Sequence, residues 1–342
     1  MLCFHMLTAG ERNELRHSGM RGHGSFFTPA PARVAQFRIY RLTGRTVELP
    51  RSLRKWSVPI PIRRKRSEEP AQPDVAEQQK NLARPSAEDI YQQVATNARQ
   101  ELARSNTSLA ISGFGGGAFM GLSAMGTAIA AALMGDSPHA HMISRMFYPL
   151  GFIVVIVGRA QLFTENTLYP VALVLAEKRE LWNTLRLWAV VLPANVAGAF
   201  SFAAIASWTP ALNPAYVGSL SRLGSGAIAH PAAALFWSGV IGGWIIALAA
   251  WLVSGSHSVT GSVALIWLLT YIVGLGDFGH CIAGSCEVLV TILTHRAPWI
   301  AYPHWFFPVV LGNICGGVGL VTILEYGQVI YGNDDNKVET KG

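Results

Sequence analysis

Charged residues are scarce over most of this 342-residue chain, and that scarcity indicates its class. Only 14% of the residues are charged, 51% are hydrophobic, and the mean hydropathy is positive. Of the 27 Lys and Arg residues, 18 lie before residue 106, which leaves nine for the remaining two-thirds of the chain. This composition excludes an ordinary soluble domain and indicates a polytopic membrane protein with a basic extension.

Cysteine is scarce as well, which excludes a disulfide-stabilised secreted scaffold. Three of the four cysteines fall in apolar segments, and Cys3 lies near the start of the chain. The sequence therefore predicts no disulfide. Cys281 and Cys286 lie beside His280, but a Cys-x4-Cys spacing in an apolar helix is typical of packing rather than of metal binding. No metal and no cofactor is predicted.

Residues 1–105 lack any sustained apolar period until Ser86, which could cap a short amphipathic helix running towards residue 104. Most of this extension is predicted to be disordered. It could be a solvated cytoplasmic tail drawn to anionic lipid, an organellar transit peptide, or an overlong start assignment with Met6 or Met20 nearer the true beginning. Because no aromatic-basic interleaving is present, no nucleic-acid partner is predicted.

Apolar windows of about 20 residues predict a membrane domain over residues 106–330. The positive charges that flank these windows lie mostly on one side, which predicts cytoplasmic N- and C-termini and a cytoplasmic tail over residues 331–342. The six predicted spans are Leu109–Leu133, Met146–Ala176, Leu187–Thr209, Pro231–Val253, Val259–Leu293 and His304–Ile330.

The second and fifth predicted spans are too long for single helices. At about 1.5 Å per residue, they would be about 46 and 52 Å long, against a bilayer core about 30 Å thick. Each carries its polar residues near the middle, at Arg159–Thr167 and at Asp277–Glu287. Non-helical backbone at membrane depth is tolerated only where protein or a water-filled cavity satisfies it. We therefore predict two interrupted helices that face a shared interior.

An internal repeat supports this interpretation. The interrupted spans occupy the same place in each group of three, and Asn195-Val-Ala-Gly in the third span matches Asn313-Ile-Cys-Gly in the sixth. Three spans followed by three more enter from opposite sides, so the two halves form an inverted repeat with its permeation site at the broken helices. The predicted fold is an all-α membrane protein with six transmembrane helices in a 3+3 inverted repeat.

These residues resemble the formate/nitrite transporter family, whose members have six spans, an aquaporin-like inverted repeat and a pentameric assembly with one pore per protomer. The resemblance covers about residues 105–330. It is carried by Leu162-Phe163-Thr164, by Gly276-Asp-Phe-Gly-His280 and by the Gly312-Asn313 pair. The sequence of residues 158–167 is most similar to that of a divergent, poorly characterised branch of bacterial inner-membrane proteins.

The resemblance implies a role for seven residues of this chain. His280 would be the central histidine, held by the hydroxyl of Thr164 and the amide of Asn313. Phe152 and Val273 would form an apolar constriction towards the cytoplasm, and Leu162 and Phe163 one towards the outside. From the residues alone, His280 could instead be a helix-end histidine, and Thr164 and Asn313 could merely satisfy freed backbone groups.

Several positions depart from the pattern of the formate and nitrite channels. Gln161 and Gly279 stand where those channels have acidic residues, Gly284 stands where they have asparagine, and their lysine near the fourth span has no counterpart in residues 225–231. Three ionisable residues are predicted at membrane depth instead: Arg159, Glu165 and Glu287. Because an unpaired charge there is costly, Arg159 is predicted to pair with Glu287, or else to attract an anion directly.

A membrane channel or proton-linked transporter for a small monovalent weak-acid anion, or its neutral acid, is the leading hypothesis, with no enzymatic activity. Apolar constrictions exclude ions unless charge is removed, and a histidine between them can attract an anion and exchange a proton. The alternatives are a neutral-solute pore, a non-transporting scaffold, and an intramembrane serine protease that uses Ser225 and His257. The expected partners are the permeant, protons, the lipid membrane and, by resemblance, four further copies in a homopentamer.

Overall fold

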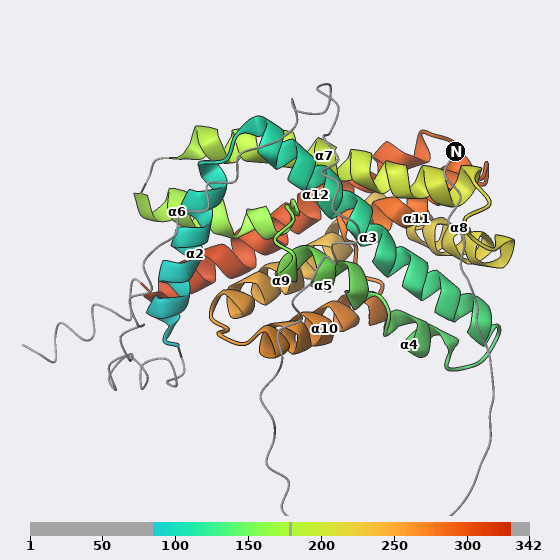
Figure 1. The fold of residues 1–342 in the computed structure, drawn as a ribbon, viewed down its shortest axis with the longest axis horizontal. Helices are drawn as coiled ribbons and strands as arrows, with labels where there is room; N and C mark the ends of the chain where they lie inside the picture. Colours follow the sequence, from blue (N-terminus) through green and yellow to red (C-terminus); the bar gives the residue numbers. More distant parts are fainter. Residues whose placement is uncertain (1–84, 178–179, 330–342) are drawn as a thin grey trace, which may run out of the picture. The chain divides into compact units, whose positions relative to one another are not determined.

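The computed structural model describes residues 85–177 and 180–329, and this part of the chain is helical (Figure 1). The predicted extension before residue 85 and the predicted tail lie outside the described residues. The helices in chain order are α2 (Ala87–Leu102), α3 (Asn106–Met134), α4 (Ala140–Arg145), α5 (Pro149–Val157), α6 (Tyr169–Glu177), α7 (Leu181–Trp208), α8 (Pro214–Ile228), α9 (Ala232–Ser254), α10 (Val259–Leu275), α11 (Cys281–Leu293) and α12 (Ala301–Ile314), with a 3₁₀ turn η2 (Glu165–Thr167) and a π-helical segment η3 (Cys315–Thr322).

Five helical stretches in the described residues are long and apolar enough to cross a membrane: α3, α4 with α5, α7, α9, and α12 with its continuation to Val329. The two shorter apolar helices are α10 and α11. The stretch that contains α5 begins at Ala140 rather than at Met146. Large apolar side chains such as Ile111, Leu133 and Trp237 are exposed, as expected of helices that face lipid.

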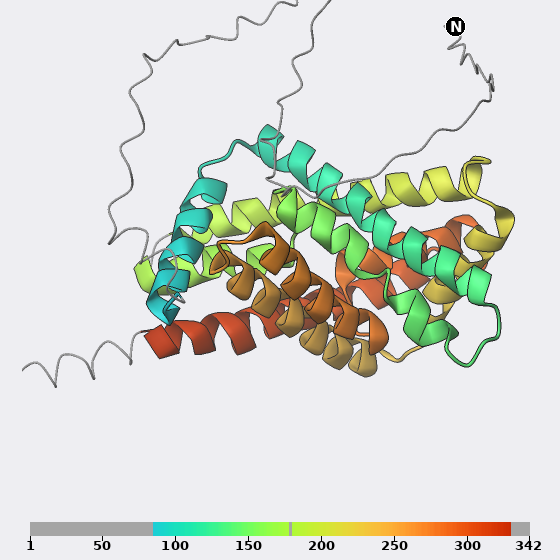
Figure 2. The same ribbon diagram turned by 60° about the horizontal axis from the view of Figure 1, so that its bottom comes forward.

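Glycines bring two pairs of helices into close contact. α3 packs along α7, and α9 packs along α12. Figure 2 shows that α3 also runs beside α4 and α5. A Cβ at Gly117 of α3 would lie 1.9 Å from the carbonyl oxygen of Asn195, and one at Gly243 of α9 would lie 2.3 Å from that of Asn313. Only glycine allows backbones to approach so closely.

Neither of the two long predicted spans is a single helix. α5 ends at Val157, and regular α-helix resumes only at Tyr169. α10 ends at Leu275, and α11 begins at Cys281. We refer to residues 158–164 and 276–280 as the first and second interrupted segments. Each begins with a glycine and continues with a residue of positive φ, Arg159 at 57° and Asp277 at 50°.

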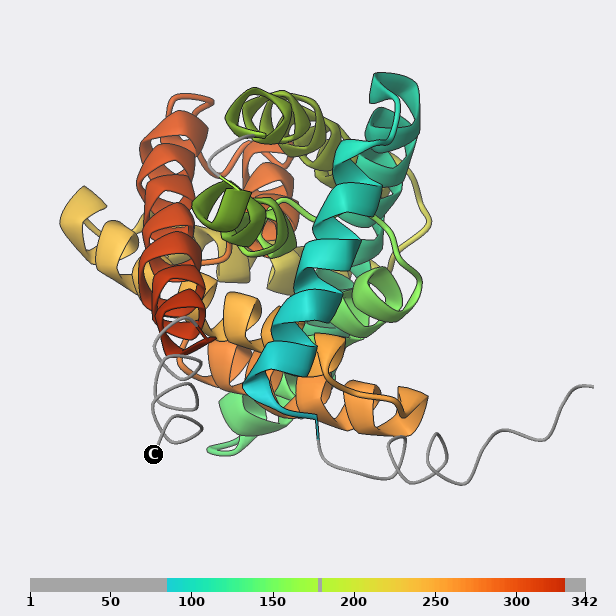
Figure 3. The same cartoon turned by 90° about the vertical axis from the view of Figure 1, so that its left-hand side faces the viewer.

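α2 is the helix expected after Ser86, and it belongs to the packed body rather than to a separate extension. Ser86 and Asp89 form a reciprocal capping box at its start. Val94 and Ala98 are fully buried, and the helix contacts α6 and α9. Figure 3 shows α2 crossing in front of the other helices. The domain boundary predicted at residue 105 is therefore too late, because the apolar face of α2 already contributes to the core.

α8 was not expected, since residues 210–230 were interpreted as a loop. Asn213 caps its first turn and Pro214 occupies its first position, both of which favour a helix start. It packs on α11, where Thr291 Oγ1 donates to the carbonyl of Ser221 at 3.0 Å. The helix was missed because it is too short and too polar to look like a span.

Candidate functional site

Asn195 fixes the first interrupted segment from inside the protein. Its side chain is fully buried. Its Oδ1 accepts from the backbone N–H of Phe163 at 2.9 Å, and its Nδ2 donates to the carbonyls of Gln161 at 2.8 Å and Gly113 at 2.6 Å. One amide thus satisfies two backbone groups of the segment that no helix satisfies, and adds a bond to a carbonyl of α3.

Asn313 makes the matching set of bonds to the second segment. Its Oδ1 accepts from the N–H of Cys281 at 2.9 Å, and its Nδ2 donates to the carbonyls of Gly279 and Gly239, both at 2.8 Å. The amide was predicted to hold the ring of His280. It binds the backbone on either side of that residue instead, because both N–H groups of the amide are taken by carbonyls.

The ring of His280 bridges the two interrupted segments. Its side chain is only 2% exposed, and Nε2 lies 2.8 Å from the hydroxyl oxygen of Thr164. Nδ1 accepts from the N–H of Ala283 at 3.1 Å, which caps the start of α11. Because Nδ1 is an acceptor, the neutral ring carries its proton on Nε2 and donates it to Thr164.

The four predicted constriction residues are all buried. Phe152 presents its ring to His280, with centroids 4.9 Å apart. Phe163 packs edge-on against Trp188 at 5.6 Å. Leu162 has the backbone position that matches His280, since the residue after each one bonds to an asparagine amide. Val273 lines a cavity together with Tyr148 and His280.

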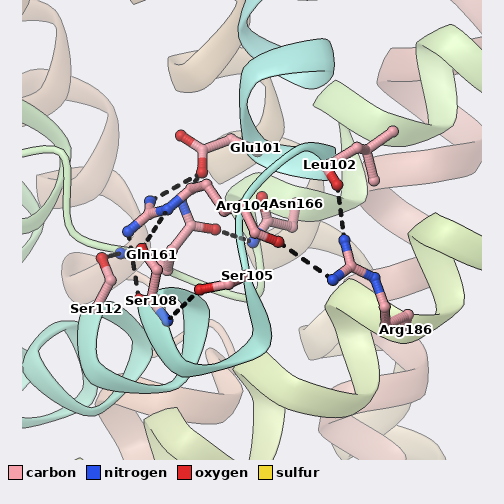
Figure 4. Close-up of polar contacts among 9 residues, drawn as sticks. All are labelled: Glu101, Leu102, Arg104, Ser105, Ser108, Ser112, Gln161, Asn166 and Arg186. Carbon is pink, nitrogen blue, oxygen red and sulfur yellow. Dashed lines mark hydrogen bonds and ion pairs between the residues drawn. The ribbon is translucent and has the colours of Figure 1, made fainter.

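A first cavity of about 370 Å³, which we call the Glu101 cavity, lies where α2 meets the first interrupted segment. Gln161 Nε2 donates to Glu101 Oε2 at 2.7 Å, and Gln161 Oε1 accepts from Asn166 at 2.9 Å (Figure 4). Glu101 also pairs with Arg104 at 2.9 Å. Glu165 lines the same cavity and is 7% exposed.

A second cavity of about 640 Å³, which we call the Arg145 cavity, is lined by His280 and by Glu287 of α11. Arg145 forms an ion pair there with Asp277, whose other oxygen lies 3.1 Å from His141 Nε2. Arg222 also lines this cavity.

Arg159 and Glu287 do not pair, contrary to the ion pair predicted for them. Arg159 is exposed and lines the Glu101 cavity, whereas Glu287 lines the Arg145 cavity. The two residues therefore line different cavities, and no ion pair joins them in the described residues.

Ser225 and His257 do not meet either. Ser225 lies within α8 rather than in a loop, between Gly224 and Gly226. His257 lines the Glu101 cavity, whereas Leu223 and Gly226 on either side of Ser225 line the Arg145 cavity. The geometry offers no hydrolytic pair of these two residues.

Four residues at the site were not predicted as such: Glu101, Arg145, Tyr148 and Asp277. Tyr148 packs on Phe152 with ring centroids 5.5 Å apart, and its side chain lies against Gly274. The available signal was the isolated charges Arg145 and Asp277 at the edges of apolar runs. Their separation of 132 positions along the chain hid the pair.

The long apolar helices, the two polar cavities and the buried His280 define a helical membrane protein for passage of a small solute. Comparison with known proteins then identifies the family. The sequence model described as formate/nitrite transporter matches residues 88–327, so the chain belongs to the formate/nitrite transporter family.

Two curated relatives show how far the similarity extends. The inner membrane protein YfdC of Escherichia coli K12 is 29% identical over 245 residues, which cover 70% of this chain and 78% of YfdC. The formate channel BtFdhC of Bacillus thuringiensis is 23% identical over 240 residues, which cover 68% of this chain and 92% of that channel.

Solved structures share the fold. One described as an FNT family ion channel aligns with a TM-score of 0.63 at 20% identity, covering 69% of this chain and 97% of its own. Another, described as a pentameric formate channel with formate bound, aligns with a TM-score of 0.59 at 20% identity, covering 66% and 97%. At this identity the likeness establishes the fold.

Proposed function

We propose that this protein is a membrane channel or proton-linked transporter for a small monovalent weak-acid anion such as formate or nitrite, or for its neutral acid. The observation that carries this proposal is the buried ring of His280, which lines the Arg145 cavity, contacts the ring of Phe152 and bonds to Thr164 of the first interrupted segment. Family membership and the relatives named as formate channels support the same permeant class.

Six spans in an inverted repeat with two broken helices are part of the proposal. In this arrangement, α4 with α5 and α6 make the second span, and α10 with α11 make the fifth. The support comes from the two asparagines, which bond to matching backbone groups in the two segments. Such repeats place the permeation site at the broken helices.

The passage favours a neutral molecule at its centre. Phe152, Leu162 and Thr164 are essentially inaccessible and line neither cavity, so a permeant must pass between them with little water. For an acid of pKa about 3.7, forming the neutral species at pH 7 costs about 4 to 5 kcal/mol, far less than stripping water from the anion. His280 Nε2–H and the Thr164 hydroxyl would hydrogen-bond that species.

The imidazolium hypothesis for His280 receives less support. A proton on Nδ1 would break its bond with the N–H of Ala283 and uncap α11. We therefore assign His280 the part of a neutral hydrogen-bond donor. Anion attraction falls to Arg145 and Arg222 at one cavity and to Arg159 at the other.

We further propose a bacterial inner membrane, cytoplasmic termini and a homopentamer. The YfdC relative is an inner membrane protein, and one structural neighbour is pentameric. The Glu101 cavity then faces the cytoplasm, since α2 follows the N-terminal residues and borders it. Native mass spectrometry of the purified protein tests the assembly, and a monomer would contradict it.

Purified protein in liposomes tests the transport function. Formate, nitrite, hydrosulfide, acetate and glycerol are compared by light scattering with a pH dye in the lumen. We expect flux of weak acids with proton movement and no flux of glycerol. Voltage-independent flux of glycerol alone would favour the neutral-solute pore. No flux of any solute would favour the scaffold.

A further inference from the structure

Glu287 lies at a place in the site that the proposed function leaves without a task. It follows His280 by seven residues on α11, and both line the Arg145 cavity. Residues seven apart lie on one face of a helix, about two turns from each other. Gly284 stands between them and lines the same cavity, and the ring of Trp305 packs against it.

The carboxyl group of Glu287 is buried and incompletely partnered. The residue is 7% exposed, and within the described residues Oε1 has no hydrogen-bond partner. Arg145 bonds through Nη2 to Asp277, and no hydrogen bond joins it to Glu287 in the described residues. A buried charged oxygen without a donor is costly, whereas a carboxylic acid carries its own proton and can donate it to a ligand. The geometry thus fits an acid that faces the cavity.

The groups around Glu287 would gather an anion. Arg222 donates to Ser219 at 2.6 Å and forms no ion pair within the described residues. No titratable side chain is added to this cavity by α3, α7 or α12, which pack on α11, since Tyr302 of α12 bonds to Ser285 instead. The titratable and charged groups that face the cavity with Glu287 are Arg145, Tyr148, Arg222, His230, Asp277 and His280.

His280 is poorly placed to supply a proton to that anion. Its Nδ1 accepts from the backbone, and its Nε2 proton is directed to Thr164. Releasing the Nε2 proton from a neutral ring would leave an imidazolate, which is not accessible near neutral pH. A carboxyl group has no such restriction, because its acidity is close to that of a small carboxylic acid.

We propose that Glu287 protonates the permeant, a small monovalent carboxylate or similar weak-acid anion, within the Arg145 cavity. In this step the O–H bond of the Glu287 carboxylic acid breaks, and an O–H bond forms on an oxygen of the anion. The products are the neutral acid, which continues past His280, and the Glu287 carboxylate. A proton from bulk water then restores the acid. This proposal rests on the proposed function and names the residue that carries the proton.

The test uses full-length protein in liposomes with formate as the probe. Proton entry per formate is measured with a lumenal pH dye for wild type, Glu287→Gln and Glu287→Asp. Gln keeps the shape of the side chain but has no acidic proton. Glu325→Gln is the matched control, because Glu325 lies on the continuation of α12 and lines neither cavity. Gel filtration confirms that each variant is assembled.

We expect Glu287→Gln to lower formate-driven proton entry about tenfold and to flatten its pH profile. Glu287→Asp should restore much of it, and Glu325→Gln should stay within twofold of wild type. Unchanged proton entry and an unchanged pH profile in assembled Glu287→Gln would overturn the proposal.

A second readout does not depend on flux. Infrared difference spectra on adding formate should contain a carboxylic-acid carbonyl band in wild type that Glu287→Gln loses and Glu325→Gln retains. If wild type moves no solute, the proposed function fails, and this band still decides the assignment of Glu287. Its absence from wild type, or its persistence in Glu287→Gln, would overturn the assignment.

Discussion

The two interrupted segments have nearly the same backbone and very different chemistry. Asn195 and Asn313 bind them through the same three kinds of backbone group, and Ser112 and Ser238 each accept from a segment N–H, at 3.1 and 2.9 Å. Yet Leu162 stands in one segment where His280 stands in the other. The same backbone bonds therefore occur in both segments, while the histidine occurs in only one of them.

The cavities differ in the same sense. The Glu101 cavity is lined by two glutamates, Glu101 and Glu165, and one arginine, Arg159, whereas the Arg145 cavity is lined by two arginines, one glutamate, Glu287, and the buried His280. The backbone bonds of the two segments match, but the charged side chains of the two cavities differ. This difference suits a passage in which a molecule changes its charge state on one side. Variants of the two asparagines change the backbone bonds that the segments share, whereas variants of His280, Gln161 and Arg159 change a side chain of one segment.

The largest expected effect comes from removing either asparagine amide. Asn195→Ala and Asn313→Ala each leave two buried backbone groups unpaired, at about 1 to 3 kcal/mol per group, and remove a third bond to a helix carbonyl, so each should destabilise the protein by more than about 2 kcal/mol. Thermal unfolding followed by fluorescence-detected gel filtration measures the loss.

Asn183→Ala is the control for this experiment, since Asn183 is exposed and bonds only to Glu180 within the described residues. It should change the stability by no more than about 0.5 kcal/mol. If only one of the two buried asparagines mattered, the equivalence of the segments would be wrong.

Replacing His280 should affect transport more than folding. Asparagine is a good N-cap, so His280→Asn keeps the start of α11 while removing the ring between the cavities. We expect formate flux in liposomes to fall about tenfold. Leu162→Asn, at the matching backbone position, should change flux less and leave the pH profile in place. A His280→Asn protein with wild-type flux and an unaltered pH profile would contradict the assigned role.

Much of the scaffold was predictable from sequence, and the charged pairs were not. Helix length against bilayer thickness pointed to both interruptions, and the matching Asn-x-x-Gly sequences pointed to the two asparagines, because these signals are local. The partners of Arg145 and Glu287 depend on which end of the protein each segment faces. Sequence periodicity carries no information on that point, so Arg159 and Glu287 were paired wrongly.

α2 was predictable as a helix but not as a neighbour of the site. Its capping box is a local signal, whereas the contact between Glu101 and Gln161 spans 60 positions. Constriction residues show a related limit. Phe163 and Val273 are both buried as expected, yet burial alone did not reveal that one packs on Trp188 and the other lines the Arg145 cavity.

Gln161→Gly tests a moderate difference between the segments, because it gives the first one the glycine that the second has at position 279. The change removes the bonds to Glu101 and Asn166, at a cost of about 1 to 2 kcal/mol. We expect faster hydrogen exchange in α2, measured by mass spectrometry, while α11 remains as protected as in wild type. Equal exchange of α2 in both proteins would show that its apolar face alone holds it.

The smallest expected effect concerns the two residues of positive φ. Arg159 is exposed and has no ion pair within 4 Å in the part of the chain described, so Arg159→Gly should relieve its left-handed backbone and stabilise the protein by about 0.5 to 1 kcal/mol. Asp277→Gly relieves the same strain but leaves Arg145 without its carboxylate, so its net effect should be near zero or destabilising. Thermal unfolding of both variants compares them. A stabilised Asp277→Gly protein would show that this ion pair contributes little to the fold, and that the charge of Arg145 is free for an anion.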